Sequence, residues 1–395
     1  MAAILRRPGV RQAVVASAVR EWKFLRGSPW DFALATWIPC TCLIILAWLF
    51  TSGVPRELPI AVVDEDHSAV SRALIRALDA APGIRVAAQP VGLEQAWSLA
   101  RKLDVYAVAY VPADASRNGV RTRSVTVFAY YNASYRTAAQ TAIGDMNDVV
   151  RAIGGQVATT YVAKAKGPQS VRQAPVIAQT TVLFNSGRSY ETFLLALVLP
   201  AVMLFGLTLS ATAAFAREIR DRSVATWLES SGGRLLPAVM GKALPYVALF
   251  LAQGVGSVIW VALIPGYRVR GSIMLLVVAQ ALMCIAYVAI GLAVAGALRN
   301  MATALSVVSL YAGTALAYSG RTFPVNDAST FVRVWNLLLP FTSYVKLQAQ
   351  QLDMGAPASA SLPHVAALLA FILIPGTIGL RLYGRTARQP ASWGE

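Results

Sequence analysis

The chain has 395 residues, of which 56% are hydrophobic and 14% are charged. This composition excludes an ordinary soluble enzyme and predicts a polytopic membrane protein. The formal net charge of +16 fits basic residues that flank membrane spans and meet anionic membrane lipid, so we do not expect nucleic-acid binding. Residues 1–29 carry an amphipathic stripe, Val15, Val19 and Trp22, which predicts a cytoplasmic helix ahead of the first span.

The first membrane span is assigned to residues 30–52. Its core, Phe32–Phe50, holds no charged residue and is long enough to cross ~30 Å of hydrocarbon as a helix. The residues that follow it, 53–190, are mostly polar. They are therefore predicted to form a separate domain on the opposite side of the membrane.

This inserted domain is predicted to be a small layered α+β structure. Apolar runs predict strands and amphipathic runs predict helices, in the order β-α-β-α-β-β. The expected elements are a strand at Leu58–Asp66, a helix at Ser68–Ala81, a strand at Ile84–Ala88, a helix at Leu93–Leu103, strands at Tyr106–Val111 and Ser124–Tyr130, and a helix from Ala133 to about Ala165. His67 lies beside acidic residues, but consecutive positions at a strand end rarely converge on one metal ion, so a solvated turn is favoured and no metal site is expected.

Further spans are predicted after the domain, within residues 191–382. They lie at Phe193–Phe215, Leu244–Ile264, Ile273–Leu298, Ala302–Ala317 and His364–Leu382. Basic residues gather between the second and third spans, after the fourth span and in the tail at residues 383–395, so the positive-inside rule places both termini in the cytoplasm. The predicted fold is a membrane all-α bundle of six transmembrane helices with an inserted extracytoplasmic α+β domain.

Polar side chains within the spans have two interpretations. They can serve helix packing, which we favour, or they can line a substrate path. The candidate path residues are Thr208, Ser210, Gln280, Tyr287, Ser306, Tyr311 and Thr314. The acidic residues near the spans fall at their ends, which argues against an ion-driven transporter with a buried proton relay.

The strongest local signal is the loop at residues 216–243, between the second and third spans. Mixed charges precede a short apolar helix with Trp227 and Leu228, and a glycine pair ends it. On the surface, Trp227 and Leu228 would form an apolar anchor with a charged rim, as in a protein–protein hot spot. A helix that rests on lipid is the alternative.

This loop resembles the corresponding loop of type 2 ABC exporter permeases. That family's pattern is an acidic-basic run, a small or hydroxyl residue and a Leu pair, followed by Gly-Lys-x-x-Pro at the start of the next span. The matching positions are Glu218, Arg222, Ser223, Trp227, Leu228, Gly241, Lys242 and Pro245.

The outer loop at residues 319–362 also resembles that family. A Gly-x-x-Phe-Pro ends at Phe323 and Pro324, and a Pro-x-Thr begins at Pro340, ahead of a short membrane-dipping helix. The large domain between the first two spans is similar to that of the bacterial multidrug subgroup. Two departures are Ser186, where the family pattern has Pro, and Arg321, which enters a usually apolar site.

The resemblance implies a non-catalytic permease subunit in the bacterial inner membrane that exports a hydrophobic or amphipathic compound. Its loop helix would dock on a cytoplasmic ABC ATPase, and that partner would bind ATP and Mg²⁺, because this chain has no Gly-x-x-x-x-Gly-Lys-Ser/Thr motif and no cofactor of its own is expected. A second copy or a sibling permease would complete a dimer, and a periplasmic adaptor would contact the outer domain. The alternative is a non-transporting, membrane-anchored receptor or assembly factor.

Overall fold

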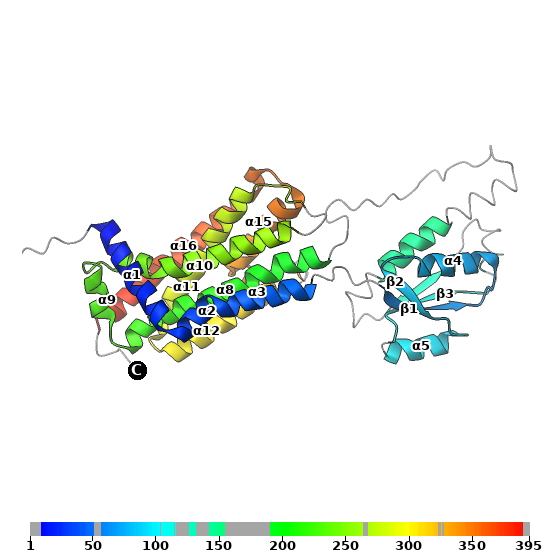
Figure 1. Cartoon of the computed structure of the whole chain (residues 1–395), viewed down its shortest axis with the longest axis horizontal. Coiled ribbons are helices and arrows are strands. Elements are labelled where there is room, and N and C mark those ends of the chain that lie inside the picture. The colour runs from blue at the N-terminus through cyan, green and yellow to red at the C-terminus, as the bar shows by residue number, and fades with distance from the viewer. Residues whose placement is uncertain are drawn as a thin grey trace, which may run out of the picture. The chain divides into compact units, whose positions relative to one another are not determined.

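A computed structural model describes residues 9–50, 57–102, 104–113, 115, 126–131, 142–154, 190–263, 268–322, 325 and 328–389. The chain divides into two compact units (Figure 1). One, the membrane unit, comprises Met1–Thr51 and Leu183–Glu395, and the other, the inserted unit, comprises Ser52–Val182. The predicted insertion of a small mixed α/β domain into a helical membrane protein is confirmed.

The described part of the inserted unit contains a sheet of four strands in the order β2-β1-β3-β4. These strands are β1 (Leu58–Asp64), β2 (Ile84–Ala88), β3 (Ala107–Val111) and β4 (Phe128–Tyr131). Strand β1 pairs in parallel with β2 and with β3, while β3 and β4 are antiparallel. Parallel neighbours require crossover connections, and helices α4 (Ala69–Asp79) and α5 (Leu93–Lys102) supply them.

Both faces of this sheet are covered, which explains why β1 reads as a continuous apolar run. Ile60 and Val62 pack into a core with α4 and with the helical residues 142–154, whereas Ala61 and Val63 pack into a second core with α5. Figure 1 shows α4 and α5 on opposite sides of the strands. The rest of the helix predicted for residues 133–165 lies outside the described residues.

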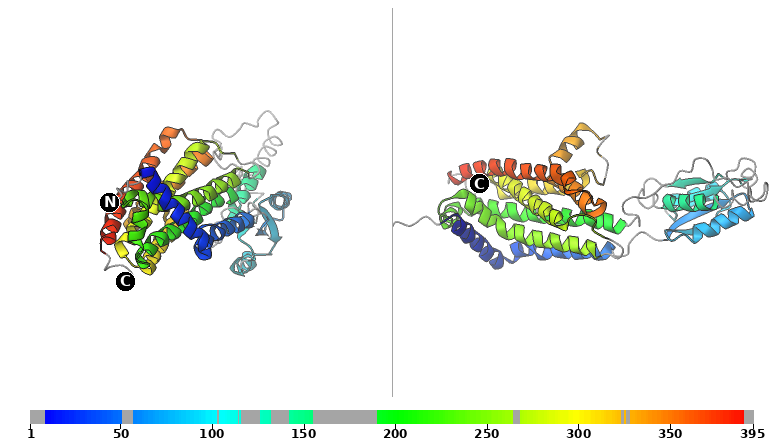
Figure 2. Two further views of the ribbon diagram at one scale, coloured as in Figure 1. Left: turned by 60° about the vertical axis from the view of Figure 1, so that its left-hand side comes forward. Right: turned by 90° about the horizontal axis from the view of Figure 1, so that it is seen from above.

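Among its described residues, the membrane unit has six helical segments that are long and apolar enough to span a membrane. Figure 2 shows the helices of this unit packed side by side. The six segments are Pro29–Leu49, Phe193–Arg220, Leu235–Ala262, Ile273–Leu298, Met301–Tyr318 and Ala358–Ala387. All six predicted spans are therefore found. Most extend beyond the apolar cores predicted from sequence, because the helices continue through charged residues at their ends.

The helix of the first span is interrupted, where the sequence predicted one continuous helix. It consists of α2 (Pro29–Ala35) and α3 (Trp37–Phe50), which meet at Thr36. Pro39 lacks the N–H that would donate to the carbonyl of Ala35 in a regular helix. The side-chain amide of Gln253 donates to that carbonyl instead, at 2.9 Å, so the third span satisfies the group that the proline leaves open.

Helix α11 (Ile273–Leu298) occupies the interior of the bundle. It packs against α8 (Tyr190–Arg220), α10 (Leu235–Ala262) and α16 (Ala358–Ala387). A Cβ on Gly296 would stand 2.7 Å from the backbone nitrogen of Tyr383, so the absence of a side chain lets α11 and α16 approach closely. The fifth span is α12 (Met301–Gly313) continued by α13 (Ala315–Tyr318).

The segment before the last span folds into short helices. These are α14 (Thr330–Leu337), α15 (Pro340–Ala349) and the π-helical turn η3 (Gln350–Met354). Helix α15 is largely buried and packs against α11 and α16. The loop between α10 and α11 is joined to this segment, because the N–H of Gly271 donates to the carbonyl of Gln351 at 2.8 Å.

Candidate functional site

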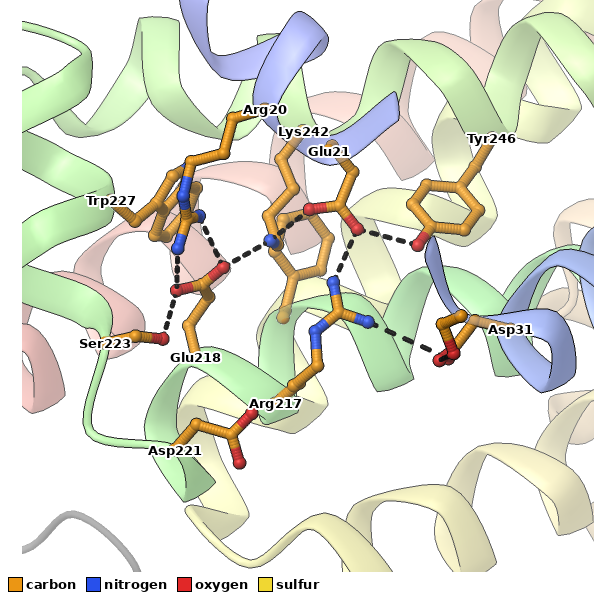
Figure 3. Close-up of polar contacts among 12 residues, drawn as sticks. Arg20, Glu21, Asp31, Arg217, Glu218, Asp221, Ser223, Trp227, Lys242 and Tyr246 are labelled. Carbon is orange, nitrogen blue, oxygen red and sulfur yellow. Dashed lines mark hydrogen bonds and ion pairs between the residues drawn. The ribbon is translucent and has the colours of Figure 1, made fainter. Parts of the chain in front are cut away.

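Four segments that are far apart in the sequence meet at one end of the membrane unit. They are α1 (Val10–Gly27), the last turns of α8, the short helix α9 (Val224–Ser230) and the first turns of α10. Figure 3 shows charged side chains from α1, α8 and α10 pointing toward one another there. We call the six residues that form ion pairs at this place the charge cluster: Arg20, Glu21, Asp31, Arg217, Glu218 and Lys242.

Lys242 is the centre of the charge cluster. Its side chain is completely buried, at 0% exposure. The ammonium nitrogen lies 2.5 Å from Glu21 Oε2 and 2.6 Å from Glu218 Oε1, so one cation joins carboxylates from α1 and from the end of α8. The cation also lies 5.1 Å from the centre of the Trp227 ring. This lysine therefore fixes the start of α10 to both neighbouring helices.

Glu218 connects the cluster to the loop that precedes α9. Arg20 donates to its two carboxylate oxygens at 2.6 and 3.1 Å, a bidentate geometry. The hydroxyl of Ser223, which precedes α9, donates to Glu218 Oε2 at 2.5 Å. Any displacement of Ser223 must therefore disturb a carboxylate that α1 and α10 also hold.

Glu21 connects α1 to the membrane spans. Its carboxylate accepts from Arg217 Nη2 at 2.6 Å and from the Tyr246 hydroxyl at 2.8 Å, in addition to Lys242. Arg217 also lies 3.7 Å from Asp31 at the start of the first span. Burial raises the pKa of the Glu21 carboxyl, but the nearby charges of Lys242 and Arg217 outweigh it, so the pKa lies below its ordinary value.

This lowered pKa predicts a loss of stability in acid. A carboxyl whose folded-state pKa is depressed contributes stability that is complete above the ordinary value of 4.5 and is lost as the pH falls through the folded-state pKa. We expect the free energy of unfolding in detergent micelles to decrease as the pH is lowered below about 4.5. In Glu21→Gln this part of the pH dependence should be missing. An identical acid limb in both proteins would contradict the prediction.

The cluster is balanced in charge, with three cations and three anions among its six members. Balance is necessary because burying an isolated ion costs several kcal/mol of desolvation free energy. A close ion pair with further hydrogen bonds offsets roughly that cost. The arrangement is thus sensitive to the loss of any single charge.

The indole of Trp227 points into the protein. Its side chain has 0% exposure, its Nε1 donates to Ser17 Oγ at 2.9 Å, and its ring packs edge-on against Tyr383, with the ring centres 5.9 Å apart. The predicted exposed anchor is therefore wrong for Trp227 in the isolated chain. Leu228 is half-buried and packs against the same core.

The exposed side of α9 is small and polar. Ala225, Thr226 and Glu229 face away from the bundle, while Val224 and Trp227 are buried. Arg222, just before α9, is exposed and adopts a positive φ of 54°. Helix α9 thus presents a polar outer face on a buried apolar base.

Gly241 permits the contact between α1 and α10. A Cβ at this position would stand 2.3 Å from the carbonyl oxygen of Val14 and 2.6 Å from the Cβ of Ser17. Neither atom is the end of a flexible side chain, so a larger residue would force the helices apart. The Gly-Lys pair therefore serves both the close approach, through Gly241, and the charge cluster, through Lys242.

Comparison with known protein families gives a separate line of evidence about the chain as a whole. A model of the ABC-2 family of transporter proteins matches residues 29–381, which is most of the chain. The chain belongs to the ABC-2 transporter family. Comparison with curated protein sequences gives no match. As an ABC-2 membrane permease it is a non-catalytic transport subunit, and in such systems a separate ATPase subunit binds ATP.

Within this ABC-2 permease, several residues of the site were not identified from sequence. They are Ser17, Arg20, Glu21, Arg217 and Tyr246. The buried residues of α1 are Ala13, Ser17, Glu21 and Leu25, a stripe at intervals of four. That spacing of four is visible in the sequence. Two polar residues, Ser17 and Glu21, on the face of α1 opposite its apolar stripe were the signal that could have identified the buried face.

The candidate path residues fall into separate environments. Tyr287 and Tyr311 lie together, with ring centres 6.1 Å apart, and Thr314 accepts from the indole nitrogen of Trp335 at 3.0 Å. Thr208 is buried and donates to the carbonyl of Leu204 within its own helix. Ser306, by contrast, is exposed on α12 and donates to Ala302.

Three buried path residues have polar atoms with no hydrogen-bond partner among the described residues. These atoms are Ser210 Oγ, Gln280 Oε1 and the hydroxyl oxygen of Tyr287. The Gln280 amide nitrogen contacts Met203 Sδ at 3.8 Å. Such groups inside a bundle require either water or a ligand, so they remain candidates for a path.

The outer loop of the permease is only partly described. Pro340 is buried as the first residue of α15, whereas Phe323 and Pro324 lie outside the described residues. Arg321, the departure from the family pattern, donates to Asp353 in η3 at 2.7 Å and lies over the ring of Phe193 at 5.6 Å. The guanidinium thus joins the end of the fifth span, η3 and the start of the second span.

Proposed function

We propose that this chain is the permease subunit of a bacterial exporter that moves a hydrophobic or amphipathic compound, driven by a cytoplasmic ABC ATPase. Membership in the ABC-2 family supports the transport role. The proposal places the protein in the inner membrane, with both termini and α9 in the cytoplasm and the inserted unit outside. In this orientation Arg220, Arg222, Arg234 and Arg299 are cytoplasmic, as the positive-inside rule requires.

The observation that carries the coupling role is the attachment of α9 to three helices at once. Ser223, just before α9, donates to Glu218 on α8, and Trp227 of α9 donates to Ser17 on α1. Lys242 of α10 in turn donates to Glu218. A force applied to the outer face of α9 is therefore transmitted to α1, α8 and α10 through short, buried polar contacts. Such a continuous set of contacts is needed if an ATPase bound to α9 is to move the membrane spans.

The ATPase would bind the outer face of α9, formed by Ala225, Thr226 and Glu229. Small and polar residues on a short helix fit a groove of a partner protein, while the indole beneath them fixes the orientation of the helix. Trp227 would therefore position α9 from behind the interface, and the exposed side chains of α9 would contact the ATPase.

The transport path and the dimer are also part of the proposal. The ring centres of Tyr287, Tyr311 and Trp335 follow one another at 6.1 and 6.0 Å, and Tyr287 is buried at 0% exposure. Such a row of rings inside the bundle suits a path for an apolar or aromatic compound. One chain supplies few spans for an alternating-access path, so a second copy or a sibling permease would complete it. The inserted unit would contact a periplasmic adaptor or cap the exit.

A charge placed on the outer face of α9 tests the coupling role. We expect Thr226→Arg to reduce co-purification with the partner ABC ATPase roughly tenfold or more, because a long cation in the contact would be desolvated without a partner. Export by cells should fall with it. The thermal midpoint of the permease should stay within about 2 °C, because surface changes of this kind have small effects on stability.

Thr303→Arg is the matched control. Thr303 is exposed in the first turn of α12 at the same end of the bundle, where Arg220 contacts Met301 at 3.3 Å. This variant should bind the ATPase as wild type does. Equal binding by Thr226→Arg and Thr303→Arg would exclude α9 as the docking helix, and a permease that exports without any ATPase would exclude the whole proposal.

A further inference from the structure

An apolar groove runs between the outer faces of α1 and α10. It has a volume of about 490 Å³ and is lined by Val15, Val19 and Trp22 on α1 and by Leu244 and Ala248 on α10, among others. Val15 and Leu244 are each 52% exposed. The α10 wall belongs to the third span, and α1 directly precedes the first span. In the proposed topology the groove therefore lies near the cytoplasmic ends of these spans.

Two cations of α1 follow Trp22 closely in the chain, at one end of this groove. Trp22 lines the groove, and the guanidinium of Arg26 lies 5.0 Å from the centre of its ring. Lys23 and Arg26 are both exposed. Glu21 is the only acidic residue of α1, and it is buried in the charge cluster. The charged side chains that α1 exposes are therefore all basic. An apolar cleft with cations at one end complements a ligand that has an apolar chain and an anionic head.

We propose that the groove binds one molecule of anionic phospholipid. An acyl chain lies along Val15, Val19 and Leu244, and the headgroup phosphate is held by Lys23 and Arg26. Trp22 stands between the two regions, as amphipathic rings do at membrane interfaces. A zwitterionic phospholipid fits the apolar cleft equally well but gains less from the two cations, so selectivity for negative headgroups is the distinguishing property.

The groove and the charge cluster are formed by opposite faces of the same two helices. On α1, Val19 faces the groove while Ser17 and Glu21 face the interior. On α10, Leu244 faces the groove while Lys242 is buried in the cluster. A bound chain therefore stabilises the contact between α1 and α10 on which the position of α9 depends. Lipid binding itself does not require the proposed ATPase coupling and is measured without it.

Native mass spectrometry of the full-length permease provides the test. The protein is equilibrated in micelles with phosphatidylglycerol or with phosphatidylcholine, and the fraction that retains one lipid is measured. We expect wild type to retain phosphatidylglycerol preferentially. The double variant Lys23→Gln/Arg26→Gln should lose this retention by roughly tenfold or more, because each basic residue near an anionic surface contributes a factor of about five.

Two matched controls separate the groove from general attraction to lipid. Arg385→Gln/Arg388→Gln removes two exposed cations at the end of α16, and Ala370→Trp adds a ring to an exposed position of α16. Both should retain lipid as wild type does. By contrast, Ala248→Trp fills the groove and should abolish retention of either lipid.

The proposal is overturned if wild type retains both lipids equally, or if the Lys23/Arg26 and Arg385/Arg388 double variants behave alike. It is also overturned if a folded Ala248→Trp protein retains lipid as Ala370→Trp does. A thermal midpoint equal to that of wild type shows that each variant is folded. Should Ala248→Trp fail to fold, the paired charge variants decide the question alone.

Discussion

Replacing Lys242 by Met is expected to destabilise the membrane unit by about 3–5 kcal/mol, because removing one partner of a buried ion pair leaves an uncompensated buried charge. Glu21 and Glu218 would remain within the bundle, while only Arg20 and Arg217 would be left to balance them and Asp31. Met conserves the length and apolar stem of the side chain. The loss would therefore measure the charge rather than a cavity. Unfolding in mixed micelles, followed by circular dichroism, gives this value.

A compensating change should recover much of that stability. In Lys242→Met/Glu21→Gln the cluster has two cations and two anions, and the Gln side chain still accepts from Arg217 and Tyr246 at the Glu21 position. We expect the double variant to be at least 1.5 kcal/mol more stable than Lys242→Met alone, since coupled charges in one network are strongly non-additive.

Arg220→Gln is the control for loss of a cation at the same end of the bundle. Arg220 pairs with Asp221 at 2.8 Å, but both side chains are about half exposed. Exposed ion pairs contribute little, so we expect a change of less than about 1 kcal/mol. Similar losses in Arg220→Gln and Lys242→Met, or no recovery in the double variant, would show that the buried charge is not the origin of the effect.

The spans and the sheet of this protein were predictable because each rests on a local pattern. A run of about 20 apolar residues requires a span, whatever its neighbours are. The strands and helices from Leu58 to Val111 were likewise predicted closely, since short apolar runs mark the buried strands and a period of 3.6 marks the amphipathic helices between them. The interruption at Thr36 was not predicted, because the partner of the Ala35 carbonyl, Gln253, lies on another span.

The site was harder to predict because hydropathy does not show which face of α1 is buried. The exposed stripe holds the apolar Val15 and Val19, whereas the buried stripe holds the polar Ser17 and Glu21 together with Ala13 and Leu25. Glu21 is stable inside only because Arg217 and Lys242 meet it, and they are about 200 residues away in the chain.

The burial of Trp227 was missed for a different reason. Helix α9 has seven residues, from Val224 to Ser230, which is too short for a periodic pattern to show which face is inside. A lone tryptophan among charged residues then suggests a surface anchor. The structure instead surrounds it with Ser17, Tyr383 and Lys242, each from a different helix.

Because Trp227 is enclosed, Trp227→Ala should cost about 3–5 kcal/mol of folding free energy, as a large buried ring is replaced by a cavity. Trp227→Phe keeps most of the ring and loses the bond to Ser17, so a loss of about 1–2 kcal/mol is expected, measured again in mixed micelles. Trp37→Ala makes the same truncation at a ring that is 68% exposed, and should cost less than about 1 kcal/mol.

The same variants distinguish a support behind the interface from a direct contact with the ATPase. If Trp227 positions α9 from inside, ATPase association should fall in the order of lost stability: Trp227→Ala most, Trp227→Phe less, and Trp37→Ala not at all. If Trp227 instead contacts the ATPase directly, Trp227→Ala should be as stable as wild type and still fail to bind the ATPase. That outcome would require the indole to leave its buried position in the complex, and would return the anchor role to Trp227 itself.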